Sequence, residues 1–193
     1  MEFKDIKYEH KIHARAFLDR AIANLEVFDF ESKASCLFYA ALELRFGIEA
    51  RLFEYLEATL KSQKKDSSTI KEYIATKLLK KLTVEDENAD KPVTLSIPSG
   101  GEKTGVSMQY TPVTKELAQM HGKLGELLHF KFFRNNRNWY IKIIQEDPSF
   151  KSLIYFRNFL EDVVNELKQA TSGMLLTHPR FTEIINEVID SEN

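Results

Sequence analysis

The sequence has very little cysteine, no excess of one charge and no long apolar run, and each absence excludes a class of protein. Cys36 is the single cysteine, so an intramolecular disulfide is excluded, and its place on an apolar helical stripe predicts a small buried side chain. The 27 basic and 29 acidic residues leave a net charge of −2, which gives no overall field to attract nucleic acid or an anionic membrane. Any contact with nucleic acid must therefore come from a local patch.

No segment approaches the roughly 18 consecutive apolar residues of a membrane-spanning helix, and the first residues mix acidic and basic groups without the apolar core of a signal peptide. We therefore expect a cytoplasmic protein with no membrane partner. The sequence also lacks a glycine-rich phosphate loop with its lysine, the HExxH and GxSxG patterns, and any cluster of cysteines. We accordingly expect no metal site and no cofactor.

The segment from Phe30 to Leu60 is the strongest structural signal in the chain. Apolar residues recur there every three or four positions, the period that places side chains on one face of an α-helix. These residues are Leu37, Ala41, Leu44, Ile48, Leu52 and Tyr55. Four more apolar residues widen the stripe, namely Phe38, Leu42, Phe53 and Leu56. The breadth of the stripe predicts a central helix that packs on more than one side.

Apolar periodicity and capping residues predict further helices, and one region alternates polar and apolar residues as a β-hairpin does. The helices are expected over Tyr8–Phe28, from a cap at Asp66 or Ser67 to Leu82, over Lys115–Phe132 with Thr114 as the cap, over Ser149–Ala170 and over Phe181–Ile189. The hairpin is expected at about residues 92–111, around Ser99-Gly100-Gly101. An isolated hairpin is marginally stable in water, so it must lean on the helices or pair with another chain, which makes it a candidate recognition arm. The prediction is one mainly α domain, residues 1–193, a helical bundle with a β-hairpin insertion.

Arg45 is the first candidate functional residue. It lies four residues after Ala41 and three before Ile48, close to the apolar stripe, so its guanidinium must reach solvent or pair with an acid. Glu49, four residues further on, is the nearest partner. One interpretation is a structural pair that joins two helices; in the other, Arg45 faces a groove and binds a phosphate or a carboxylate. The neighbouring charges are expected on the solvated face of the helix, namely Glu43, Arg51, Glu54 and Glu57.

A second group of candidates extends from His121 to Tyr140. His121 and His129 are two helical turns apart, roughly 12 Å by the helix rise, which is too far for both to hold one metal. Gly122 and Gly125 each cost a helix roughly 1 kcal/mol and indicate a close approach or a local opening. Basic and aromatic side chains interleave after His129, and such a mixture can hold phosphates while rings stack on unpaired bases. Alternatively the aromatic side chains belong to the core and the basic groups form a polar loop. The candidate binding residues here are Arg134, Asn135, Arg137 and Trp139.

The segment from His13 to Leu52 resembles the first two helices of HEPN domains. In that family a helix with regularly placed alanines and leucines leads through a short turn into a second helix with an Ala-Leu-Glu element, which here is Ala41-Leu42-Glu43. The active RNases of the family carry an arginine, usually followed by a polar residue, with a histidine after four to six intervening residues. Arg134-Asn135 resembles the start of that motif, but no histidine follows it, since the corresponding positions hold Trp139, Tyr140 and Ile141. The usual RNase centre is therefore expected to be missing.

The resemblance implies a non-catalytic binding or assembly module of a prokaryotic toxin–antitoxin or defence-type system. The implied partners are a second copy of the chain in a homodimer, an antitoxin or nucleotidyltransferase-like protein, or RNA. In a first alternative the chain is a metal-independent endoribonuclease in which Arg45, Arg134 and Arg137 hold a phosphodiester. His129 is then the general acid or base, because histidine is the side chain that most often transfers protons near neutral pH. In a second alternative the chain is a purely structural homodimer joined through the hairpin.

Overall fold

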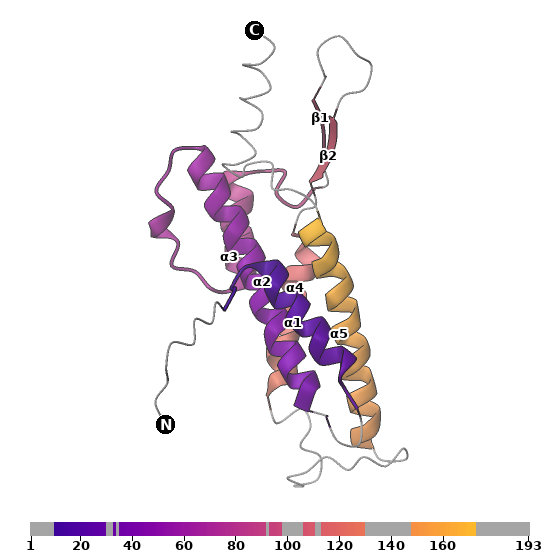
Figure 1. Cartoon of the computed structure of the whole chain (residues 1–193). Helices are drawn as coiled ribbons and strands as arrows, with labels where there is room; N and C mark the ends of the chain where they lie inside the picture. Colours follow the sequence, from indigo (N-terminus) through magenta and orange to yellow (C-terminus); the bar gives the residue numbers. More distant parts are fainter. Residues whose placement is uncertain are drawn as a thin grey trace, which may run out of the picture.

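The structure is a computed structural model, and it describes residues 10–29, 33, 35–91, 93–97, 106–110, 113–129 and 148–172. Within these residues the chain is mainly helical, as the sequence predicts. The elements in chain order are α1 (Ala14–Glu26), α2 (Ser35–Ser62), the short 3-10 helix η1 (Ser67–Thr69), α3 (Ala75–Glu85), β1 (Val93–Ile97), β2 (Val106–Tyr110), α4 (Lys115–Leu128) and α5 (Pro148–Ser172). Figure 1 shows the other helices gathered around α2.

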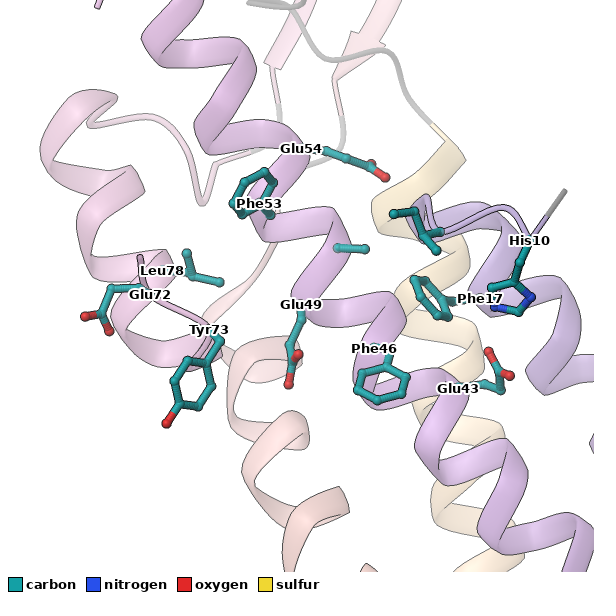
Figure 2. A pocket seen from close by; sticks show the side chains of 12 residues that line it. His10, Phe17, Glu43, Phe46, Glu49, Phe53, Glu54, Glu72, Tyr73 and Leu78 are labelled. Carbon is teal, nitrogen blue, oxygen red and sulfur yellow. The ribbon is translucent and has the colours of Figure 1, made fainter. Parts of the chain in front are cut away.

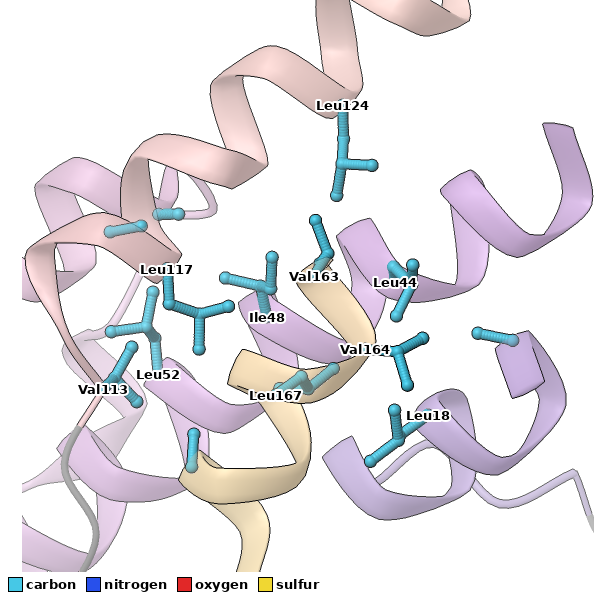
Figure 3. Close-up of a cluster of buried hydrophobic side chains, with 14 of the residues drawn as sticks. Leu18, Leu44, Ile48, Leu52, Val113, Leu117, Leu124, Val163, Val164 and Leu167 are labelled. Atoms are coloured by element: carbon cyan, nitrogen blue, oxygen red, sulfur yellow. The ribbon is translucent and has the colours of Figure 1, made fainter. Parts of the chain in front are cut away.

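The long helix α2 organises the hydrophobic core. It contacts α1, α3, α4 and α5, which confirms that it packs on more than one side. All six residues of its predicted inner stripe are buried. Figure 3 shows Ile48 and Leu52 of α2 beside Leu117 of α4, whereas Leu44 of α2 lies beside Val163 and Val164 of α5. Each such leucine or isoleucine contributes about 1.5–3 kcal/mol when it is fully buried, so these contacts favour the close packing of the helices against α2.

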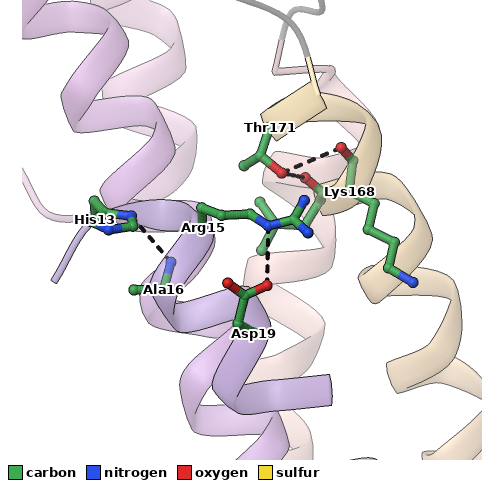
Figure 4. Close-up of polar contacts among 7 residues, drawn as sticks. His13, Arg15, Ala16, Asp19, Lys168 and Thr171 are labelled. Atoms are coloured by element: carbon green, nitrogen blue, oxygen red, sulfur yellow. Dashed lines mark hydrogen bonds and ion pairs between the residues drawn. The ribbon is translucent and has the colours of Figure 1, made fainter. Parts of the chain in front are cut away.

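Two contacts fix the start of α1, and they place it later than the predicted start at Tyr8. His13 is extended and caps the helix, because its Nδ1 accepts a hydrogen bond from the backbone N–H of Ala16 at 3.2 Å (Figure 4). The backbone N–H of Ala14 donates to Glu54 Oε1 of α2 at 2.7 Å. A carboxylate thus satisfies an otherwise unpaired donor at the positive end of the α1 dipole. The first turn of α1 is therefore tied to the middle of α2.

Gly47 of α2 lies at a close contact with both α1 and α5. A methyl group at this position would lie 2.8 Å from Leu167 Cδ2 and 3.3 Å from Phe17 Cβ. A side chain at this position would require Leu167 or Phe17 to shift, so glycine fits this close contact without rearrangement. This crossing also brings Phe17 of α1 beside Phe46 of α2, with 5.7 Å between their ring centroids.

The region before α3 differs from the sequence prediction. Asp66 does act as a cap, but it caps only η1, through a hydrogen bond from the Ser68 backbone N–H at 2.8 Å. The chain is then extended or irregular until α3 begins at Ala75, so the predicted start of this helix was wrong. The physical reason is local: serine side chains compete for backbone hydrogen bonds, and β-branched residues such as Ile70 lose rotamer freedom in a helix. As a result Tyr73 lies outside the helix and is 70% exposed.

The remaining elements complete the bundle. The Tyr55 hydroxyl donates to Asp86 Oδ2 at 2.6 Å and holds the turn after α3 against α2. In the predicted hairpin region β1 and β2 pair antiparallel, with Val93 opposite Tyr110. Thr114 caps α4 as predicted, since its Oγ1 accepts from the Leu117 N–H at 3.1 Å. The six predicted core residues of α5 are all buried, namely Leu153, Phe156, Leu160, Val163, Val164 and Leu167. The predicted terminal helix, residues 181–189, lies outside the described residues.

Candidate functional site

The central helix carries an exposed apolar lane as well as its buried stripe. Tyr39, Leu42, Phe46 and Phe53 are 58%, 41%, 41% and 39% exposed, and their spacing places them on one face of α2. We call these four residues the α2 lane; it is roughly 21 Å long by the helix rise. The sequence predicts Leu42 and Phe53 as extensions of the packed stripe, and this is wrong because both side chains are among the exposed large apolar residues of the described structure. An apolar row of this length on a surface is typical of an interaction site.

One end of the lane forms the floor of a groove. The groove has a volume of about 640 Å³ and lies between the start of α1, the middle of α2 and the segment before α3. Figure 2 shows Phe46 and Phe53 on α2, with Phe17 on the side of α1 and Tyr73 on the side of α3. The twelve residues that line it are His10, Ile12, Phe17, Glu43, Phe46, Glu49, Ala50, Phe53, Glu54, Glu72, Tyr73 and Leu78. Its volume is that of a site for a small ligand or for the anchor side chains of a peptide.

The charged groups that line this groove are carboxylates. Among the described residues, Glu43, Glu49, Glu54 and Glu72 belong to its lining, whereas no described lysine or arginine does. The partners of these glutamates stand outside the lining; Arg20 Nε, for example, donates to Glu43 Oε2 at 2.9 Å. The guanidinium of Arg20 also lies over the ring of Phe17, 4.5 Å from its centroid, which holds both residues in place.

Arg45 and Glu49 form the pair that the sequence predicts, and the structure adds a third member. Arg45 Nε lies 3.4 Å from Glu49 Oε1, and the same oxygen lies 2.5 Å from Nε2 of His121 on α4. His121 is buried, so this contact satisfies an imidazole nitrogen that would otherwise be costly to desolvate. A methyl group at Gly125 would lie 2.8 Å from Arg45 Nη1, so the absent side chain leaves room for the guanidinium. We call Arg45, Glu49 and His121 the α2–α4 cluster.

Two features of these charges differ from what the sequence predicts. His121 was not recognised as the partner of Glu49, because the two residues are 72 positions apart and no local pattern joins them. Arg51 was expected on the solvated face, yet it is only 6% exposed, and its Nη1 lies 3.9 Å from Glu54 Oε2. Its spacing of three residues from Ile48 and four from Tyr55 was the signal that it belongs to the buried stripe. A long arginine stem can lie along apolar surface while its head reaches a carboxylate.

The other predicted site residues are not brought together by the described part of the structure. His129 is exposed and ends α4, where its backbone N–H donates to Glu126 O at 3.1 Å. It lies one helical turn beyond Gly125, the residue against which Arg45 packs. Arg134, Asn135, Arg137 and Trp139 lie outside the described residues.

Two further findings concern the described residues as a whole. No three histidine, cysteine, aspartate or glutamate side chains among them are arranged to hold a metal ion. None of the helices within the described ranges is long and apolar enough to cross a membrane. Comparison with protein-family models, with curated proteins and with solved structures finds no match for the chain. The described residues therefore form a helical bundle with an apolar groove whose described charged lining residues are carboxylates.

Proposed function

We propose that this chain is a HEPN-like, non-catalytic binding and assembly module that receives a partner protein on the exposed face of α2. The observation that carries the proposal is the α2 lane with its groove, because four large apolar side chains on the helix that organises the core are 39–58% exposed within the described structure. Leaving such side chains in water has a cost that burial against a partner removes, about 25 cal/mol for each Å² of apolar surface.

The resemblance to HEPN domains supplies the setting of this proposal. A prokaryotic toxin–antitoxin or defence-type system, with an antitoxin or a nucleotidyltransferase-like protein as partner and a second copy of the chain in a homodimer, fits a cytoplasmic assembly module. Within the described residues, the chemistry of the groove favours a protein over RNA. Its carboxylates repel phosphates, whereas RNA-binding sites combine aromatic rings with basic groups. An RNA contact would instead fall on Arg134 and Arg137.

Position-specific cross-linking tests the proposal. A photoreactive phenylalanine replaces Phe46 in the lane, and in a matched control it replaces Tyr155, an aromatic residue of α5 that is 62% exposed. In cells that express the chain naturally we expect a defined cross-linked protein species from position 46 and none from position 155. Equal labelling from both positions, or no labelling from position 46, contradicts the proposal.

A metal-independent endoribonuclease is the second candidate function. The observation that favours it is the position of Arg45 against Gly125, one helical turn from His129. Purified protein incubated with mixed structured and single-stranded RNA in EDTA separates the two functions when cleavage and retention are measured together. The binding module predicts no cleavage above background. Cleavage that disappears in His129→Ala, Arg134→Ala or Arg45→Ala establishes the enzyme.

A further inference from the structure

We infer that the groove between α1, α2 and the segment before α3 receives a basic amphipathic helix from the partner protein. This inference rests on the proposed function and adds the chemistry of the partner. Phe46 and Phe53 are seven residues apart on the floor of the groove, roughly 10 Å along the axis of α2. Two helical turns on an incoming helix span the same distance, so apolar residues at i and i+7 can contact both rings.

The carboxylates lie on both sides of this apolar floor. Glu43 and Glu54 point toward the α1 side, and Glu72 lies beside Tyr73 on the α3 side (Figure 2). A helix with one apolar row flanked by lysines or arginines therefore places its rows of charge opposite these glutamates. Such complementarity selects the partner and its orientation more than it adds affinity.

The carboxylates retain acceptor sites for incoming cations. Arg20 contacts Oε2 of Glu43, and both Arg45 and His121 contact Oε1 of Glu49. Among the hydrogen bonds of the described residues, none uses the second oxygen of either group. Since a carboxylate accepts at two oxygens, a lysine or arginine from the partner can bind without displacing the internal contact.

Charge argues against two other occupants. A second copy bound through the same groove in a two-fold dimer brings the groove glutamates of one copy close to those of the other. An acidic segment meets the same repulsion, and like charges brought together at an interface are strongly unfavourable. The basic helix is the occupant whose charge and apolar pattern both match the groove.

A selection experiment tests this chemistry with the full-length chain. The probe is a displayed library of helical peptides with apolar residues at i, i+4 and i+7 and random residues elsewhere, selected on the wild-type protein. We expect the enriched peptides to be net basic. We also expect their binding to weaken at least tenfold in Phe46→Ala and severalfold in Glu72→Gln, and to weaken as salt is raised.

Two matched variants control for general effects on the fold. Tyr155→Ala removes an exposed aromatic ring on α5, and Glu161→Gln removes a glutamate that is ion-paired at the surface as Glu72 is. Both should bind the selected peptides like the wild type. Neutral or acidic peptides that depend on Phe46 overturn the inference and leave the proposed function standing. If no enriched peptide depends on Phe46, both are overturned.

Discussion

Replacing Gly47 by alanine tests the helix crossing on which the groove depends. In a helix interior this change normally stabilises by about 0.8–1 kcal/mol, because glycine has the greater conformational freedom to lose. At Gly47 the new methyl group would lie 2.8 Å from Leu167 Cδ2, inside a packed core, and such overpacking costs about 1–3 kcal/mol. We therefore expect Gly47→Ala to destabilise the protein by about 1 kcal/mol.

Gly122→Ala is the matched control, because a methyl group at Gly122 meets no atom within 4 Å. It should stabilise the protein by about 1 kcal/mol. Urea denaturation followed by circular dichroism measures both changes as shifts of the midpoint at constant slope. In Leu167→Val, which removes the atom that the new methyl group meets, Gly47→Ala should lose most of its cost. If Gly47→Ala and Gly122→Ala stabilise equally, α1, α2 and α5 do not cross as closely as the structure places them.

Two further predictions concern charged groups outside this crossing. In a double-mutant cycle measured by urea denaturation, the coupling free energy between Glu49→Ala and His121→Ala should be about 1–2 kcal/mol. The reason is that either single change leaves the other residue poorly solvated and without its partner. Additive effects of the two changes would show that the contact between Glu49 and His121 contributes nothing to stability. The pKa of Asp66 is lowered by two hydrogen bonds, the larger effect coming from the Ser68 hydroxyl and the smaller from the Ser68 backbone N–H. The ionised carboxyl therefore stabilises the fold at a pH above its unfolded pKa, and this stability is lost as the pH falls through the folded pKa. An NMR titration should show the Asp66 pKa rising toward its ordinary value in Ser68→Ala, and an unchanged value would contradict this cause.

The helical faces that build the core could be predicted from the sequence, because burial on two or more sides leaves a dense apolar period of 3.6 residues. This holds for the inner stripe of α2 and for α5, where every predicted core residue is buried. The pair of Arg45 and Glu49 could also be predicted, since residues four apart lie side by side on any α-helix. Local rules also gave the Thr114 cap. They failed at the start of α3, where two adjacent serines and β-branched residues outweighed the apolar spacing.

The groove could not be predicted from the sequence. An apolar repeat identifies one face of a helix, but it does not show which other element packs against that face. Leu42 and Phe53 recur at the same intervals of three or four residues as the buried residues of α2. Their exposure depends on where the other helices lie against α2, which the interval does not reveal. The contact between Glu49 and His121 was hidden for a related reason. It depends on how α4 lies across α2, which is a property of the assembled bundle.

Some glutamates of the groove are required by the fold and one is not. Only substitution of the second kind measures recognition of the partner alone. Glu54 satisfies the first N–H of α1, and Glu49 satisfies the buried His121, so the closure of the bundle already requires carboxylates at both positions. Their charge would be present in a protein with no basic partner. Glu72 is different, because its described ion-pair partner is Lys77 at 3.7 Å on the surface, and such a pair contributes about 0–1 kcal/mol to stability. A loss of peptide binding in Glu72→Gln therefore measures recognition, whereas the same loss in Glu49→Gln combines recognition with a weakened α2–α4 contact.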